Sequence, residues 1–460
     1  MKLKALLFTL ICCILFAACS EKGAKTLFNG KDLKGWTTEG QTAVKDGVMT
    51  LSGKDAKAVL TKGDLKNFVV ELDIRTTPGG KGALWFHTDG TLSKGYKVAI
   101  NNDITDEVWW RMTGSLVSVR NLTKSIAKEG EWFKLRISVD YNSILVSVNG
   151  IDVVEYNQPD EPYRIGENTN TLISSGTLAL ESQGNGEIQL RSIVLETLPD
   201  EHERQLVVAI DENDDEIIRL HQADFPVLEY HAHLKGGLTV GDICNHALKS
   251  GINYAIAPNC GIGFPITDDA GVIAFLDSFR HEPVTLAMQA EGREWVTTFS
   301  QSVRDEFDYV FTDAMTFIDA KGRRTRLWIS DETWIENEQQ YMDLIVDKIC
   351  GVLTEPMDIY VNPCFLPEKM ADRYDEFWTE ARMDKFVAAL AKSGKALEIN
   401  NRYRIPNLAI IKKAKDAGVK FTCGTNNAGN SDLGRLEYFI ETKKALGIKA
   451  SEMYKPKIKL

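Results

Sequence analysis

The sequence predicts a multidomain protein, an all-β sandwich or jelly roll followed by a closed or nearly closed parallel α/β barrel. The chain has 460 residues, which is more than a single hydrophobic core usually serves. Between residues 26 and 198, apolar and polar residues alternate in short runs, as in half-buried strands. From residue 225 onward, short β-branched runs alternate with longer helical segments, as in repeated β–α units.

The N-terminus has the features of a signal peptide. Lys2 and Lys4 precede an apolar run that is too short to span a bilayer in a mature protein. Cys19 follows small residues and resembles the lipidated cysteine of bacterial lipoproteins, although an ordinary signal peptide cut nearby is the alternative. We therefore expect a signal peptide over 1–18, a lipidated tether over 19–25, and a bacterial lipoprotein in the periplasm or outer membrane, held to the membrane through its lipid anchor.

The first half contains strand-like segments separated by Gly, Asn and Asp turns. Many short strands with few helices are typical of a sandwich or jelly roll, here expected over 26–198. The pair Asn149 and Gly150 predicts a hairpin turn. A charged linker over 199–224 follows, and its acidic cluster is expected to be a solvated surface. Strands are expected within residues 67–76, 81–90, 96–103, 131–150 and 188–197.

The second half, 225–460, contains seven candidate strands with amphipathic segments between them. Two of these segments end in Gly394 and Gly418, the usual residue after a helix. Repeated β–α units form parallel sheets, and seven in one domain indicate a barrel. The strands are expected within residues 227–234, 254–259, 284–292, 309–315, 358–364, 396–401 and 420–427.

Each of these seven segments ends in polar residues. In a parallel barrel these ends lie on one face, where the active sites of such barrels are found. The sequence therefore predicts a site at this face. We expect catalytic roles for Glu291, Asp313, Glu398, His231, His233 and Arg293, and substrate-binding roles for Asn362, Asn400 and Asn426.

His231 and His233 stand two residues apart, so their side chains point to the same side of a strand. Two imidazoles and one carboxylate are a common ligand set for a divalent metal ion, and Glu291 is a suitable third ligand. The alternative is a pocket lined by hydrogen-bonded histidines without a metal. The sequence leaves both open.

The second half resembles the PHP (polymerase and histidinol phosphatase-like) family. The likeness covers about 225–454 and rests on EYHAHLKGG at 229–237, LAMQAEGRE at 286–294 and FTCGTNNAGNSDLGRL at 421–436. It implies a distorted seven-stranded, TIM-type barrel that binds up to three metal ions.

Three positions depart from the metal-binding motifs of that family. Asn259 and Cys260 stand where the family usually has Asp-His, and Asn362 precedes Pro where it usually has His. Asn426 stands where the family usually begins Asp-x-His. Amides are weaker metal ligands than carboxylates or imidazoles, so a full three-metal cluster is not expected. A single ion on His231, His233 and Glu291 stays open.

The first half resembles the 3-keto-disaccharide hydrolase domain family, a concanavalin-like jelly roll. The likeness spans about 26–198 and rests on LFNGKDLKGW at 27–36, GEWFKLRISVDYNSILVSVNG at 130–150 and LALESQGNGEIQLRSIVLE at 178–196. It implies a carbohydrate substrate that carries a ketone at C3. Where the family commonly has GYEVQ, this chain has GYKVA, with Lys97 in place of Glu. Substrate-binding candidates in this half are His87, Tyr96, Lys97, Trp110 and Arg111.

Composition excludes some partners and cofactors. The net charge of -11 argues against a nucleic-acid partner, because no broad cationic surface is available. Beyond the N-terminal segment no CxxC pair occurs, so neither a disulfide framework nor a zinc knuckle is expected. No nucleotide cofactor is expected, and a divalent metal ion is the one candidate cofactor.

Three functions are compatible with these features. The first is an enzyme that breaks down 3-keto-glycosides or their 2-hydroxy-3-keto-glycal products, as a lyase, hydratase or hydrolase. The second is a PHP-like, metal-dependent phosphoesterase tethered to a sugar-binding module. The third is a glycan-binding lipoprotein without catalysis. The first accommodates both halves of the chain and is the hypothesis we prefer.

Overall fold

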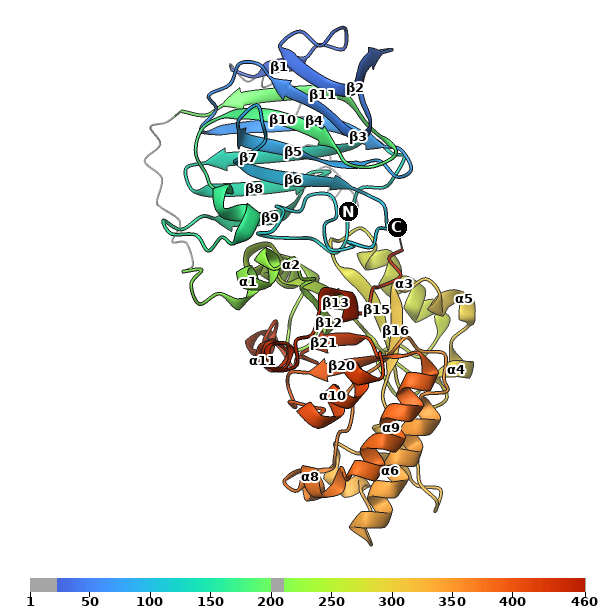
Figure 1. Ribbon diagram of the computed structural model, residues 1–460. Coiled ribbons are helices and arrows are strands. Elements are labelled where there is room, and N and C mark those ends of the chain that lie inside the picture. The colour runs from blue at the N-terminus through green and yellow to red at the C-terminus, as the bar shows by residue number, and fades with distance from the viewer. Residues whose placement is uncertain (1–22, 200–210, 460) are drawn as a thin grey trace, which may run out of the picture.

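The computed structural model describes residues 23–199 and 211–459. The predicted signal peptide and Cys19 lie outside these residues. The described chain forms an all-β part and an α/β part, which lie one above the other (Figure 1).

The all-β part is an 11-stranded antiparallel sheet that folds over on itself. Apolar side chains from both halves of the sheet, such as Leu84 and Ile137, meet in one buried core. The predicted jelly-roll-like fold is therefore confirmed. The strands are β1 (Lys25–Phe28), β2 (Trp36–Lys45), β3 (Val48–Leu60), β4 (Phe68–Thr76), β5 (Lys81–Thr88), β6 (Tyr96–Asn101), β7 (Phe133–Asp140), β8 (Ser143–Val148), β9 (Ile151–Asn157), β10 (Thr177–Ser182) and β11 (Glu187–Thr197).

The order of the strands across this sheet is β6-β5-β10-β3-β11-β4-β7-β8-β9, with β1 beside β11 and β2 beside β3. The predicted hairpin turn joins β8 to β9. Asn149 has φ 51° and Gly150 has φ 81°, and positive φ at both residues is what a tight two-residue hairpin requires.

The α/β part is a parallel barrel of seven strands in the order β12-β13-β15-β16-β19-β20-β21, as predicted. The thiol of Cys423 in β21 donates to the carbonyl of Leu228 in β12 at 3.1 Å, so the first and last strands lie side by side and the barrel is nearly closed. The strands are β12 (Leu228–Ala232), β13 (Asn253–Ile256), β14 (Asn259–Cys260), β15 (Thr285–Ala290), β16 (Tyr309–Thr312), β19 (Ile359–Tyr360), β20 (Ala396–Asn400) and β21 (Phe421–Gly424), with a side hairpin of β17 (Thr316–Ile318) and β18 (Arg324–Arg326).

Helices surround these strands, and α6 and α9 project furthest from the jelly roll (Figure 1). Within the described ranges, no helix has the length and apolar character needed to cross a membrane. The helices are α1 (Glu216–Gln222), α2 (Val240–Ser250), α3 (Asp269–Phe279), α4 (Trp295–Thr298), α5 (Gln301–Arg304), α6 (Glu338–Val352), α7 (Glu368–Ala371), α8 (Tyr374–Phe377), α9 (Glu380–Ser393), α10 (Leu408–Asp416) and α11 (Glu437–Leu446).

A loop of the jelly roll packs against the amino ends of the barrel strands. The ammonium of Lys124 donates to the carbonyl of Val284, just before β15, at 2.8 Å. It also lies 3.9 Å from the carboxylate of Asp308, just before β16. The side chain of Asn253, at the start of β13, donates to the carbonyl of Asn121 at 2.9 Å. The jelly roll therefore closes the amino-terminal face of the barrel.

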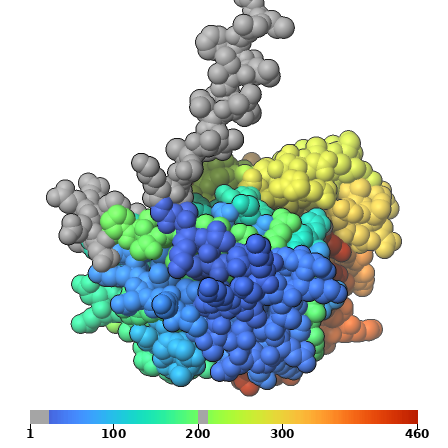
Figure 2. Space-filling view, turned by 90° about the horizontal axis from the view of Figure 1, so that it is seen from above, coloured from blue at the N-terminus to red at the C-terminus, as the bar shows by residue number. Residues whose placement is uncertain are grey.

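This packing determines where the carboxyl ends of the strands lie. Because the barrel strands are parallel, their carboxyl ends gather at the opposite face, away from the jelly roll. Seen from above, the jelly roll covers most of the barrel, and yellow and orange barrel residues appear only beyond its edge (Figure 2). We call the carboxyl-terminal face the barrel mouth.

Candidate functional site

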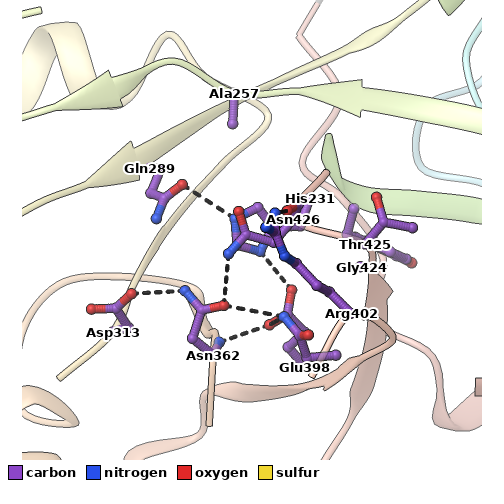
Figure 3. Close-up of polar contacts among 12 residues, drawn as sticks. His231, Ala257, Gln289, Asp313, Asn362, Glu398, Arg402, Gly424, Thr425 and Asn426 are labelled. Carbon is purple, nitrogen blue, oxygen red and sulfur yellow. Dashed lines mark hydrogen bonds and ion pairs between the residues drawn. The ribbon is translucent and has the colours of Figure 1, made fainter. Parts of the chain in front are cut away.

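The polar strand ends meet at the barrel mouth (Figure 3). Asn362, which follows β19, connects most of them. Its backbone N–H donates to the carboxylate of Glu398 at 2.7 Å, and its side-chain amide donates to that of Asp313 at 2.8 Å. Its side-chain oxygen accepts from Asn400 at 3.1 Å and from Asn426 at 3.0 Å. Four strand ends are thus held in one network.

Asn362 and Asn426 both adopt left-handed backbone conformations, with φ 44° and 45°. Asparagine tolerates this region better than most residues, because its side chain can hydrogen-bond locally. The turn after each strand redirects an amide into the network. These amides therefore hold the mouth together.

Glu291 and Asp313 are neighbouring carboxyls at the mouth, each 5 % exposed. Glu291 accepts a hydrogen bond from the amide of Asn259 at 2.7 Å. Burial and then the negative charge of Asp313 raise the pKa of Glu291 to about 8. Burial also raises the pKa of Asp313, against hydrogen bonds from Asn362 and Met315 that favour its ionised form. Glu291 can therefore hold a proton at neutral pH.

Lys235 supplies positive charge beside this pair. It is half-buried, and its ammonium interacts electrostatically with Glu291, while burial lowers its pKa. Lys235 was not among the residues predicted from the sequence. Its position two residues after His233 was the signal that could have identified it.

Two residues predicted as catalytic are sealed below the mouth. His231 and Glu398 are fully buried, and Nδ1 of His231 hydrogen-bonds the Glu398 carboxylate at 2.6 Å. Nε2 of His231 faces the side-chain oxygen of Gln289 at 3.2 Å. Asn400, predicted to bind substrate, is also fully buried and donates to Glu398 at 3.0 Å. These three residues position the network and do not reach a substrate.

The predicted metal site on His231, His233 and Glu291 does not fit this geometry. Within residues 23–199 and 211–459, no group of three or more His, Cys, Asp or Glu side chains is placed to hold a metal ion. His231 is engaged at both nitrogens, and Nδ1 of His233 contacts the carbonyl of Ala257 at 2.7 Å. We therefore derive no step through a metal. His233 is buried like His231, and its imidazole also interacts with the side chain of Asn426.

Arg293 has a different role from the predicted one. Its guanidinium binds both carboxylate oxygens of Glu355 at 3.0 Å and donates to the backbone carbonyl of Asp313 at 2.8 Å. Its two terminal nitrogens are thus already engaged by Glu355, Thr312 and the Asp313 backbone. Arg293 holds the Asp313 backbone in place from behind.

Sequence reasoning also missed two buried residues under the mouth. Gln289 precedes Glu291 by two residues, and Glu229 precedes His231 by two, so each points to the same side as its partner. Glu229 accepts hydrogen bonds from the backbone N–H of His231 and of Thr425, both at 2.9 Å. Burial raises the pKa of Glu229 to about 7. The two-residue period of a strand was the sequence signal that could have identified both Gln289 and Glu229.

In the jelly roll, His87 and Tyr96 belong to the interior. Both are fully buried. His87 bonds the carbonyl of Lys66 at 2.8 Å and accepts from the backbone N–H of Ser174 at 3.2 Å, and burial lowers its pKa to about 4. Tyr96 donates to the side chain of Gln158 at 2.6 Å. Neither residue can contact a substrate, which corrects both predictions.

Trp110 and Arg111 hold the two parts of the chain together. The indole N–H of Trp110 donates to Asp224 at 2.8 Å, and the guanidinium of Arg111 donates to the same oxygen at 2.9 Å. Trp110 is buried with Trp109 in the hydrophobic core of the barrel. The predicted sugar-stacking role of Trp110 is therefore not supported by its position.

Replacing Trp110 by phenylalanine is expected to lower the free energy of unfolding by about 2 kcal/mol, because the Asp224 carboxylate loses a buried N–H donor. Urea denaturation followed by circular dichroism measures the change. Affinity for a 3-keto sugar should be unchanged. A loss of affinity with unchanged stability would restore the sugar-binding role.

Lys97 lies on the outer face of the jelly roll, and its predicted substrate-binding role stays a prediction. The outer face is the face of β2, β3, β10, β5 and β6 that points away from the jelly-roll core. The register of these strands places two rows of side chains side by side on it. The core-facing neighbours of these residues, such as Leu84 and Val98, point the other way. The first row is Thr37, Val59, Ala179, Trp85 and Lys97, and the second row is Glu39, Lys57, Glu181, Ala83 and Ala99.

A cavity of about 430 Å³ opens at one end of the outer face. Thr37, Glu39 and Val59 line it, together with Thr177, which stands two residues before Ala179. A pocket of this size is within the range that small ligands occupy.

Comparison with known proteins finds a matching family for the jelly roll only. Residues 23–196 match the family model of the 3-keto-alpha-glucoside-1,2-lyase-like domain. The match ends before the barrel, so the resemblance of 225–454 to the PHP family stays a prediction. No curated protein matches the chain.

Solved structures similar to part of the chain include three proteins linked to carbohydrates. A glycosyl hydrolase candidate from Parabacteroides distasonis is 20% identical, with a TM-score of 0.35, over 38% of this chain and 94% of its own. The carbohydrate binding module CBM66 from Bacillus subtilis is 15% identical, with a TM-score of 0.28, over 35% and 96%. The VIP36 exoplasmic/lumenal domain bound to Ca2+ and Man3GlcNAc is 14% identical, with a TM-score of 0.28, over 40% and 91%. These values are low, and nothing further follows from them.

Proposed function

We propose that this protein is an enzyme of 3-keto-glycoside breakdown, and that the barrel mouth adds water to a 2-hydroxy-3-keto-glycal. The observation that carries the proposal is the pair of adjacent carboxyls, Glu291 and Asp313, beside the ammonium of Lys235. The substrate class is supported by the family model that matches residues 23–196.

The chemistry of this substrate fits such a pair. A 2-hydroxy-3-keto-glycal has a C1=C2 double bond conjugated to the C3 ketone. Water attacks C1, the negative charge moves to the C3 oxygen as an enolate, and a proton is then added at C2. The enzyme must supply a base for the water, a positive charge for the enolate and an acid for C2.

The mouth offers one group for each of these tasks. Asp313, whose ionised form is favoured by two hydrogen bonds, is the base in this proposal. Lys235 stabilises the enolate oxygen, and Glu291, with its raised pKa, delivers the proton to C2. Asn426, which is half-buried at the mouth, is left to bind a sugar hydroxyl. Glu398 and His231 keep this arrangement in place from below.

The test is direct incubation of the mature protein with a 2-hydroxy-3-keto-glycal, with the product followed by NMR. The proposal expects a free 3-keto sugar with a hydroxyl at C1. No product, together with no binding of the glycal, would contradict it.

The proposal also places the enzyme on a membrane. The Cys19→Ala variant is expected to move from the membrane fraction to the soluble fraction or to accumulate as precursor, because the residue that would carry the lipid is absent. Fractionation followed by mass spectrometry of the N-terminus measures this. Unchanged fractionation with an unmodified N-terminus in the parent protein would contradict the anchor.

A further inference from the structure

Another cavity lies where the jelly roll meets the barrel, beside the amino ends of β15 and β16. Its volume is about 310 Å³, and residues of both parts of the chain line it. Lys124 and Lys128 line it from the jelly roll, and Arg280 and Lys459 line it from the barrel. The C-terminal segment of the barrel, drawn in dark red, reaches this boundary (Figure 1). A ligand in this cavity would therefore contact both parts at once.

Positive charge prevails in this cavity, although the chain as a whole has a net charge of -11. The lining contains four lysine and arginine side chains but only two carboxylates, those of Glu306 and Asp308. The exposed guanidinium of Arg280 lies 3.9 Å from Glu306. Lys128 and Lys459 are also exposed, so they form the rim together with Arg280. The cavity therefore carries an excess of positive charge.

Lys124 is the buried cation of this set and forms the floor. Its side chain is 6% exposed, and its ammonium donates to the carbonyl of Val284 at 2.8 Å. The distance of 3.9 Å from this ammonium to the carboxylate of Asp308 is too long for a hydrogen bond. An ammonium has three N–H donors, so within the described ranges two donors of Lys124 have no acceptor. An anion in the cavity would supply the acceptor that these buried donors lack.

The neighbours of Lys124 leave its charge only partly balanced. The Asp308 carboxylate accepts hydrogen bonds from the backbone N–H of Leu286 at 2.8 Å and of Lys459 at 2.5 Å. Burial lowers the pKa of Lys124, Asp308 opposes this effect, and the guanidinium of Arg280 lowers the pKa further. Lys124 and Arg280 are therefore like charges that repel each other across one cavity, and an anion bound there would relieve this repulsion.

Charge and size together indicate the class of ligand. Four cations against two carboxylates leave two positive charges to be neutralised. A phosphate group carries a charge of about −1.5 to −2 at pH 7 and presents three strong acceptor oxygens, whereas a carboxylate brings one charge. The apolar side chains of Ile126 and Leu276 also line the cavity, whose volume lies at the lower end of the range for small-molecule pockets. It has room for a phosphate group and one small ring.

We propose that this cavity binds a phosphate group, free or as the ester of a small molecule, through Lys124 at its floor and Arg280, Lys128 and Lys459 at its rim. The cavity lies at the opposite end of the barrel from Glu291 and Asp313, and the inference does not depend on the proposed function. Because such a ligand contacts both parts of the chain, its binding should stabilise the packing of the jelly roll on the barrel.

The test uses the full chain in a phosphate-free buffer, with the ionic strength held constant by sodium chloride. Calorimetric titration with sodium phosphate should show one site per chain, and phosphate should raise the Tm. Glucose 6-phosphate should also bind and raise the Tm, whereas glucose should not raise it. Tighter binding of glucose 6-phosphate than of phosphate would assign the site to a phosphate ester, and tighter binding of phosphate would assign it to the free anion.

Variants of the rim locate the site. Lys128→Met and Arg280→Met should each weaken phosphate binding by about 10-fold, since each removes a charged hydrogen-bond donor. Glu306→Gln should strengthen it by about threefold, because a like charge is removed. The matched control is Lys54→Met, an exposed lysine of β3 outside the cavity lining, which should keep the Kd of the parent protein. Opposite changes in Glu306 and Lys128 variants cannot result from a general loss of folding.

A crystal structure with phosphate completes the test and should place the anion within hydrogen-bond distance of Lys124 Nζ. Phosphate bound beside Lys235 at the barrel mouth instead would overturn the inference. Equal Kd values for the Lys54, Lys128 and Arg280 variants would also overturn it, as would an affinity for phosphate no higher than that for chloride.

Discussion

Replacement of Glu291 by glutamine should lower the rate of glycal hydration by about 10²–10⁴-fold, the usual effect of removing a positioned acid–base group. Glutamine has the size of the protonated acid but cannot deliver a proton to C2. The loss should appear in kcat, measured by NMR or by absorbance of the conjugated ketone. In the parent enzyme kcat should fall as pH rises through about 8, because Glu291 then loses the proton it must donate. Glu291→Gln should lack this decline.

Glu294→Gln is the matched control for this variant. Glu294 is exposed three residues further along the chain and accepts a hydrogen bond from the backbone N–H of Arg293 at 3.0 Å, but it is not part of the mouth network. Its substitution should leave kcat within about twofold, since surface changes away from a site have small effects. A Glu291→Gln enzyme with normal kcat and an unchanged pH profile would remove the acid from the proposed mechanism.

Replacement of Lys124 by methionine should lower the free energy of unfolding by about 3–5 kcal/mol, the usual cost of removing one partner from a buried ion pair. The side chains of Lys124 and Asp308 are only 6% and 2% exposed. Burial lowers the pKa of Lys124 and raises that of Asp308, so each charge depends on the other. Without the ammonium, the carbonyl of Val284 loses its donor and the Asp308 carboxylate loses a counter-charge inside the interface. Urea denaturation followed by tryptophan fluorescence measures the loss.

The control for the interface is Lys128→Met, an exposed lysine in the same loop, which should change stability by less than about 0.5 kcal/mol. Adding Asp308→Asn to Lys124→Met should recover part of the stability, because the unpaired buried charge is then removed. Equal stability of the Lys124 and Lys128 variants would show that the two parts of the chain are not coupled through this contact.

Some features of the candidate site could be predicted from single strands. His231 and His233 were expected to share one side of a strand, and they do, with ring centres 5.0 Å apart. The polar ends of the predicted barrel strands were expected to meet, and Asn362 joins four of them. Both expectations follow from the two-residue period of a strand and from the parallel order of β–α units. Neither expectation depends on which residues from remote parts of the chain contact these side chains.

The role of Trp110 could not be predicted in this way. Two adjacent tryptophans suit a sugar platform and a hydrophobic core equally well, and the local sequence does not distinguish them. The partner that decides between them, Asp224, stands 114 residues further along the chain. Arg293 is a similar case, because Glu355, 62 residues away, uses the guanidinium that was expected to meet the substrate.

The sequence by itself determined the two fold types, since hydrophobic periodicity and turn residues are local properties that each segment carries wherever it lies. It also determined which residue types stand at the barrel mouth. Only the tertiary structure decided which of them are sealed and which can meet a ligand. His231 and Glu398 are 167 residues apart, and both are completely buried where they meet, whereas Glu291 and Asp313 each keep an exposed fraction of 5 %. Burial and pairing depend on distances between remote parts of the chain, and these distances set the desolvation and the charge interactions from which the chemistry of a side chain follows.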